Sequence, residues 1–214
     1  MKGSERTQVF EFVKRHVIGK AVVAPPVTTD VDGGRITSAY EEDAVFSNLT
    51  ETANGFSFDM TTLARGTRYV RDKGRALLAE GTLNTVRVIR YEMTERRSSG
   101  KLVGFARFIS STNTQPDPFS GAVFLVQMSL ERDRLAVHET MVGYVDFVSA
   151  DRTFKPVAWD GKYSYAREQE RLVVRYEQET FNVDPATLQR TPTGDKFPTQ
   201  VSQEIDFPME LENV

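Results

Sequence analysis

The sequence of 214 residues contains no cysteine and only two histidines. The missing thiols exclude disulfides, cysteine nucleophiles, iron–sulfur clusters and thiolate zinc sites. Two histidines also leave few ways to build a transition-metal site. We therefore expect no metal and no other cofactor.

Long apolar runs and an excess of positive charge are missing too. No apolar segment approaches the ~20 residues of a membrane span, and the first residues lack the apolar stretch of a signal peptide. Lys and Arg total 27 against 30 Asp and Glu, a net charge of −3, so no global positive field attracts nucleic acid or anionic lipid. We expect a cytoplasmic protein that binds neither nucleic acid nor membranes. The sequence leaves its oligomeric state open.

Local catalytic motifs are also missing. The sequence contains no Gly-x-Ser-x-Gly elbow, phosphate-binding glycine loop or dinucleotide fingerprint. The pair His138-Glu139 begins like the zinc-protease motif, but position 142 is Val where that motif requires its second His. Enzyme classes that depend on these motifs therefore have no local support.

One amphipathic helix is predicted near the start of the chain. Ser4 is suited to cap it, and Val9, Phe12 and Val13 recur at the three- and four-residue spacing of a helix face. Gly19 follows, and glycine commonly ends helices. We expect this helix to span about residues 4–17.

From residue 36 the apolar residues alternate with period two, which is typical of β-strands. About eight to ten strands connected by short turns are predicted up to residue 207, with a loop at 184–198. No second helix is predicted that would connect parallel strands, so neighbouring strands should be antiparallel. Because closure removes exposed strand edges, we predict an all-β, up-and-down barrel in a single domain over 1–214. A β-sandwich is the alternative.

The segment FEFVKRHVIGK, residues 10–20, combines a short helix with Gly-Lys and then an extended stretch. Together with the meander of strands, this segment resembles the start of lipocalin-like barrels, the calycin group. The resemblance implies a closed antiparallel barrel whose interior can hold one small apolar molecule. It assigns no functional residue.

The strand predicted at 102–109 carries one charged side chain in an otherwise apolar row. Arg107 lies in this row with Val103, Phe105 and Ile109. If the row faces the interior, Arg107 needs an anionic partner, because an unpaired buried charge is very costly. If the row faces outward, Arg107 is an ordinary surface residue.

Glu139 belongs to the more apolar face of the strand predicted at 135–148. We expect it to point inward, where desolvation raises the pKa of a carboxyl and suits it to general acid or base catalysis. A structural ion pair with Arg107 or another base is the alternative. A bulge at Gly143 that exchanges the two faces would bring His138 inward, which makes His138 the second acid–base candidate.

Polar tips in apolar walls are further candidates. Tyr176 and Gln178 lie on the more apolar face of their strand, where a ligand pocket or a packed core can use them. Trp159 and Tyr165 flank a predicted turn at Asp160-Gly161, where they form either a pocket rim or an aromatic plug.

The leading hypothesis is binding of a small, mostly apolar molecule with a polar or anionic group inside the barrel. Arg107 would be its counter-ion and Tyr176 and Gln178 its orienting groups. Only one predicted strand separates Arg107 from Glu139, so the two side chains should be able to meet if both point inward.

Two further classes of function stay open. In the same cavity, a cofactor-independent lyase, isomerase or cyclase would use Glu139, His138 or a tyrosine to move a proton. A non-catalytic interaction protein would instead use the N-terminal helix or the segment 184–200 as its contact surface.

Overall fold

The computed structural model describes residues 4–24, 36–71, 77–96, 98–112, 121–148, 154–196 and 199–205. In these ranges the one helix is α1 (Glu5–His16), which confirms the predicted helix. The Thr7 amide donates to the Ser4 hydroxyl at 3.3 Å and thereby caps the helix. The chain leaves the helix through Gly19, whose φ of +74° suits glycine.

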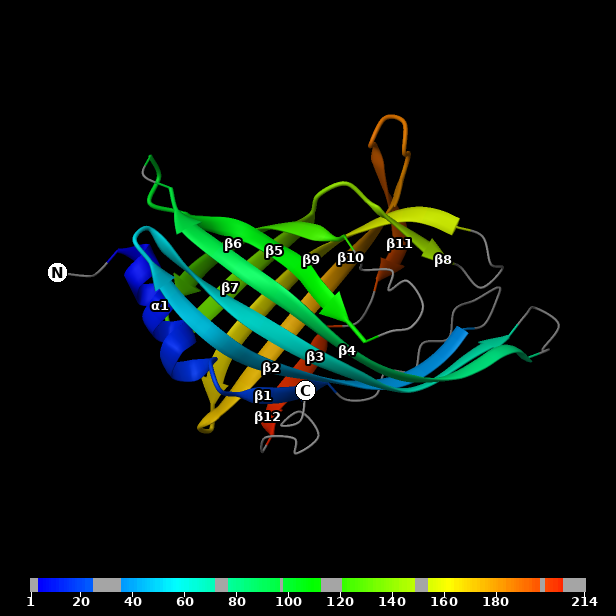
Figure 1. The fold of residues 1–214 in the computed structure, drawn as a ribbon, viewed down its shortest axis with the longest axis horizontal. Coiled ribbons are helices and arrows are strands. Elements are labelled where there is room, and N and C mark those ends of the chain that lie inside the picture. Colours follow the sequence, from blue (N-terminus) through cyan, green and yellow to red (C-terminus); the bar gives the residue numbers. More distant parts are fainter. Residues whose placement is uncertain are drawn as a thin grey trace.

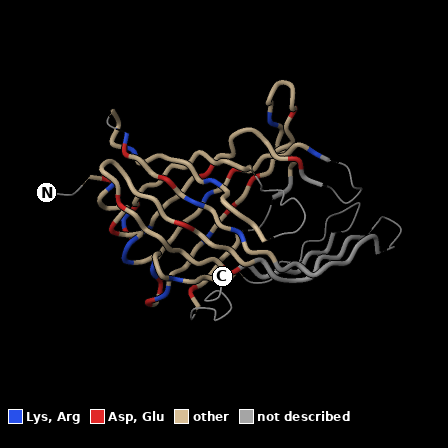
Figure 2. Tube along the Cα trace, in the orientation of Figure 1, with Lys and Arg blue, Asp and Glu red and all other residues tan. Residues whose placement is uncertain are grey.

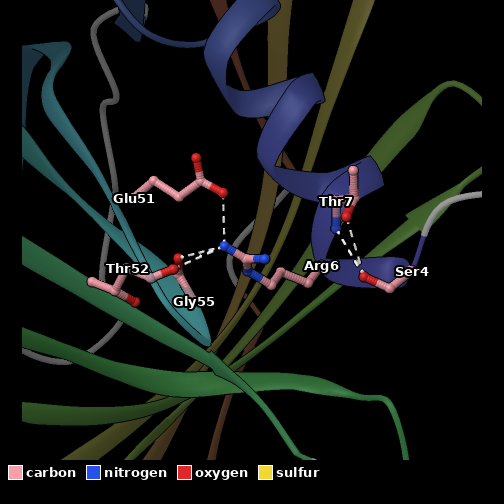
Figure 3. Close-up of polar contacts among 6 residues, drawn as sticks. All are labelled: Ser4, Arg6, Thr7, Glu51, Thr52 and Gly55. Carbon is pink, nitrogen blue, oxygen red and sulfur yellow. Dashed lines mark hydrogen bonds and ion pairs between the residues drawn. The ribbon is translucent and has the colours of Figure 1, made fainter.

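Arg6 fastens α1 to the hairpin between the second and third strands (Figure 3). Its guanidinium donates to the Glu51 carboxylate at 2.7 Å and to the carbonyl oxygens of Thr52 and Gly55 at 2.9 and 3.4 Å. Because two of these acceptors are backbone atoms of the turn, the contact fixes the position of the helix over that hairpin.

Twelve strands follow in the described ranges. They are β1 (Ala21–Ala24), β2 (Ile36–Thr52), β3 (Gly55–Arg71), β4 (Leu77–Glu95), β5 (Leu102–Ser111), β6 (Val123–Glu131), β7 (Arg134–Met141), β8 (Val145–Val148), β9 (Phe154–Glu168), β10 (Arg171–Val183), β11 (Arg190–Lys196) and β12 (Gln200–Ile205).

Ten of these strands form a closed antiparallel barrel, as predicted. Around the barrel the order is β10, β12, β1, β2, β3, β4, β5, β6, β7 and β9, and β9 pairs with β10 again. The arrangement is an up-and-down meander, not a sandwich. The long strands β2, β3 and β4 run from the helix-covered end along the whole length of the barrel (Figure 1).

The short strand β8 continues the line of β7 along β9. Thr140 pairs with Asp160, and Val145 pairs with Val157. The five residue steps from Thr140 to Val145 therefore lie opposite only three residue steps on β9. Gly143 lies in the interruption with a φ of +78°. Because the interruption adds an even number of residues, Met141 before it and Val145 after it both face inward.

Three segments differ from the prediction. The first barrel strand is β1 (Ala21–Ala24), earlier in the chain than residue 36. Arg190–Lys196, within the predicted loop, forms β11 against β10, since a strand at this position tolerates the Pro and Gly that suggested a loop. Asp160-Gly161 lies inside the continuous strand β9 and is not a turn.

The helix-covered end of the barrel is filled by apolar side chains. Val9, Phe12 and Val13 of α1 pack into one cluster with residues of most strands. Its largest fully buried strand members are Phe46, Phe56, Leu102, Met128, Leu135 and Leu172. Each such side chain contributes about 1.5–3 kcal/mol through burial. This packing closes one end of the barrel.

Glu204 of β12 holds together three elements near the helix end. Its carboxylate accepts from Lys20 and from Arg167, both at 2.7 Å, and from the Leu172 amide at 2.6 Å. Burial raises the pKa of Glu204, but these hydrogen bonds and the two positive charges together lower it below its ordinary value.

Elsewhere acidic and basic residues are interspersed along the strands (Figure 2).

Within the described ranges, no helix is long enough and apolar enough to cross a membrane.

Candidate functional site

A cavity of about 210 Å³ lies inside the barrel. Its apolar lining is Val22, Ala24, Ala44, Phe46, Met60, Ile89, Ala106, Phe124 and Val174. Its polar lining is Thr62, Arg87, Tyr91, Glu139, Tyr163, Tyr165, Tyr176, Gln178 and Ser202. Apolar walls with a few polar groups are the ordinary make-up of a small-molecule site.

Glu139 is the buried carboxyl of this cavity. Along β7 the odd-numbered side chains are buried and the even-numbered ones are exposed or half-buried, and Glu139 is only 6% exposed. The predicted inward orientation of Glu139 is confirmed. Its catalytic role stays a prediction.

Two phenols hold the Glu139 carboxyl. The Tyr91 hydroxyl donates to Glu139 Oε1 at 2.7 Å, and Tyr163 hydrogen-bonds the same carboxyl. Burial raises the pKa of Glu139 from its ordinary 4.5 to about 7, although the hydrogen bonds from the two phenols oppose this shift. Glu139 is therefore a proton donor and a proton acceptor in comparable proportion near neutral pH.

Tyr91 and Tyr165 beside it are neutral at that pH. Burial, and next the nearby charge of Glu139, raise the pKa of Tyr91 and of Tyr165 well above the ordinary value of 10.0. The cluster therefore exchanges one proton near neutrality, and that proton belongs to Glu139. Arg87 also lines the cavity, but the hydrogen bonds and charges that shift the pKa of Glu139 do not include it.

Gly161 positions Tyr163 beside Glu139. In the barrel wall Gly161 pairs with Glu139 on one side and with Gln178 on the other. A Cβ at position 161 would lie 2.7 Å from Cε2 of Tyr163, so the ring of Tyr163 occupies the space that a larger residue would need. The ring of Tyr163 also stacks on the ring of Tyr176, with centroids 5.6 Å apart.

The sequence-predicted residues are only partly brought together. Tyr165, Tyr176 and Gln178 line the cavity beside Glu139. Trp159 instead packs against a second apolar cluster that includes Met141, Val157 and Val183. His138 is exposed on the outer face of β7, because the interruption at Gly143 does not exchange the two faces.

Of the two orientations considered for Arg107, the structure shows the outward one, so its role as a counter-ion inside the barrel is wrong. Its side chain is 54% exposed and lies 3.6 Å from the Glu92 carboxylate on the outer face. The inner row of β5 is the one with Leu102, Gly104 and Ala106. At Gly104 a Cβ would lie 1.9 Å from the Glu92 carbonyl oxygen of β4, so this inward position has no room for a side chain, and the more apolar row faces outward. Arg107 and Glu139 therefore lie on opposite faces of the wall and do not meet.

Two residues of the site escaped the sequence reasoning. Tyr91 follows Ile89 and precedes Met93 on the inward row of β4, so the period-two pattern of that strand contained a usable signal. Tyr163 shares its row with Tyr165, but the glycine before it suggested a turn. Among the described residues, no group of three or more His, Asp or Glu side chains is arranged to hold a metal ion.

Comparisons with protein-family models, with curated protein sequences and with solved structures found no significant match to this chain.

Proposed function

We propose that the barrel binds a small, mostly apolar molecule that carries one polar group, in the manner of a lipocalin-like barrel. The observation that carries this proposal is the cavity of about 210 Å³ with Glu139 and its two phenols in an otherwise largely apolar wall. A packed core has no need of such a group, since burying a carboxyl without a cation costs several kcal/mol. The proposed role of the cluster is to hold the polar end of the ligand.

The size of the cavity limits the ligand. An apolar cavity of ~150 Å³ holds benzene, so the available 210 Å³ suits a molecule of roughly eight to ten non-hydrogen atoms. The leading hypothesis needs an anionic group on the ligand only if Arg107 lies inside the barrel. Because Arg107 lies on the outer face, the proposal keeps a polar group on the ligand and no longer includes Arg107 as its counter-ion.

Native mass spectrometry of freshly purified protein tests this proposal. We expect a co-purifying small molecule, and we expect Ala44→Phe, which fills the cavity, to abolish its retention. Ala136→Phe, the same substitution on the outer face of β7, is the matched control and should retain the molecule. Equal retention by both variants would show that the molecule binds elsewhere and would refute the proposal.

A second candidate function is proton transfer on a bound apolar substrate, as in a cofactor-independent isomerase, lyase or cyclase. The observation that favours it is the pKa of about 7 for Glu139, which suits a general acid or base at neutral pH. Turnover with a pH–rate profile that changes near pH 7, together with loss of rate in Glu139→Gln, would support it. Full activity of that variant would exclude Glu139 from the mechanism.

A further inference from the structure

We propose that the polar group of the ligand is a cation, and that the cavity selects small organic ammonium ions with an apolar body. This inference rests on the proposed binding function and names the ligand class of the same site. It follows from the charge of Glu139, from the rings around it and from the placement of the positive side chains.

The first argument is the unbalanced acid. Glu139 is almost fully buried, and in the described part of the chain its hydrogen-bond partners are two phenols, not a lysine or an arginine. An ionised carboxyl accepts about four hydrogen bonds, so two phenols leave acceptor positions for a ligand. A ligand that donates N–H groups and brings a positive charge supplies what the protein does not.

The second argument is the aromatic lining. The rings of Tyr163 and Tyr176 are stacked, and Phe46 meets Tyr165 edge-on with centroids 5.9 Å apart. All four residues line the cavity together with Phe124. Aromatic faces attract cations, and the attraction grows when water is excluded. The phenol rings and the one carboxyl therefore make the Glu139 end of the cavity, to which Arg87 contributes no hydrogen bond, favour positive over negative ligands.

The third argument is where the other titratable groups lie. Glu139 is faced by Tyr91 from β4 and by Tyr163 and Tyr165 from β9, while β6 brings Val126 opposite it. Arg87 is a positive group of the lining, but it is neither a hydrogen-bond partner of Glu139 nor one of the charges that shift the pKa of Glu139. An anionic ligand would need the reverse arrangement.

Binding of an ammonium ion should release a proton. Near pH 7 a large share of the protein holds Glu139 protonated, and pairing with a cation favours the ionised form. The acid proton of Glu139 then passes to the buffer, while the ammonium keeps its own protons. A neutral ligand of the same shape causes no such release.

Calorimetry with three matched probes tests the inference on the wild-type protein at pH 7. Benzylamine, which is protonated at this pH, benzyl alcohol and benzoate share one ring and fit the cavity by size. We expect benzylamine to bind roughly 10- to 100-fold more tightly than benzyl alcohol, the range for a hydrogen bond to a charged group. We expect benzoate to bind least. Titrations in two buffers of different ionisation enthalpy should reveal proton release with benzylamine only.

Glu139→Gln should remove both the preference for benzylamine and the proton release, while Glu92→Gln on the outer face should keep both. If Glu139→Gln does not fold, the two-buffer measurement on the wild type decides. Equal binding of benzylamine and benzyl alcohol, or tighter binding of benzoate, would overturn the ammonium class and leave the proposed binding function standing. No binding of any probe, with no co-purifying molecule, would refute both.

Discussion

Replacing Glu139 by Gln should change how the stability of the protein depends on pH. The pKa of Glu139 is about 7 in the folded protein and 4.5 when burial is lost, so the folded state holds the proton more tightly than the unfolded state. The free energy of unfolding therefore falls as pH rises from about 4.5 to about 7 and is level above that. At 1.36 kcal/mol per pH unit, Glu139 lowers stability by roughly 3 kcal/mol across this window.

In Glu139→Gln no group titrates at position 139. The fall in unfolding free energy between about pH 4.5 and pH 7 is therefore absent from the pH profile of this variant. We expect the difference in unfolding free energy between the variant and the wild type to move by roughly 3 kcal/mol in favour of the variant between pH 4.5 and pH 7.5. Urea denaturation followed by circular dichroism at several pH values measures this difference.

Glu92→Gln makes the same chemical change on the outer face and should follow the wild-type profile. Parallel profiles of wild type and Glu139→Gln would refute the raised pKa. An unfolding free energy of the wild type that rises with pH relative to Glu139→Gln would also refute the raised pKa, because a carboxyl whose pKa is lowered on folding gives that result.

Three further substitutions have defined outcomes. Tyr91→Phe removes a donor to Glu139, so it should cost about 1–2 kcal/mol and raise the pKa of Glu139 above about 7, extending the falling part of the stability profile to higher pH. Gly161→Ala should destabilise by about 1–2 kcal/mol because its Cβ displaces the Tyr163 ring, and denaturation showing a gain in stability would contradict that packing. Glu204→Gln should cost about 1–3 kcal/mol in urea denaturation, and an unchanged midpoint would show that its ion pairs contribute little.

The fold was largely predictable from local patterns. A capped helix face, period-two alternation and the lack of a second helix are properties of neighbouring residues, and each survives in α1 and in the strands of the barrel. The inward orientation of Glu139 followed from the alternation along β7 alone. Local pattern is sufficient where one face of a strand is clearly more apolar than the other.

The site itself depended on information that local patterns lack. Tyr91 and Glu139 lie 48 positions apart and meet only through the registers of β4 to β7. On β5 the rule that the more apolar row faces inward failed, because Phe105 is 40% exposed beside Leu125, which is 45% exposed, on the outer face. A side chain at Gly104 would meet the Glu92 carbonyl oxygen of β4 at 1.9 Å, and this close approach of a neighbouring strand cannot be read from the sequence of one strand.

The position of β12 has a consequence for how the molecule is made. β12 (Gln200–Ile205) lies between β10 and β1, and its Ile205 pairs with Ala21 from the start of the chain. Until the ribosome has released this strand, β1 and β10 both present unpaired edges, and such edges promote association between chains. Closure also joins segments of very large sequence separation, which slows folding. β12 pairs with both strands, and this pairing is what joins the β1 edge to the β10 edge and closes the barrel.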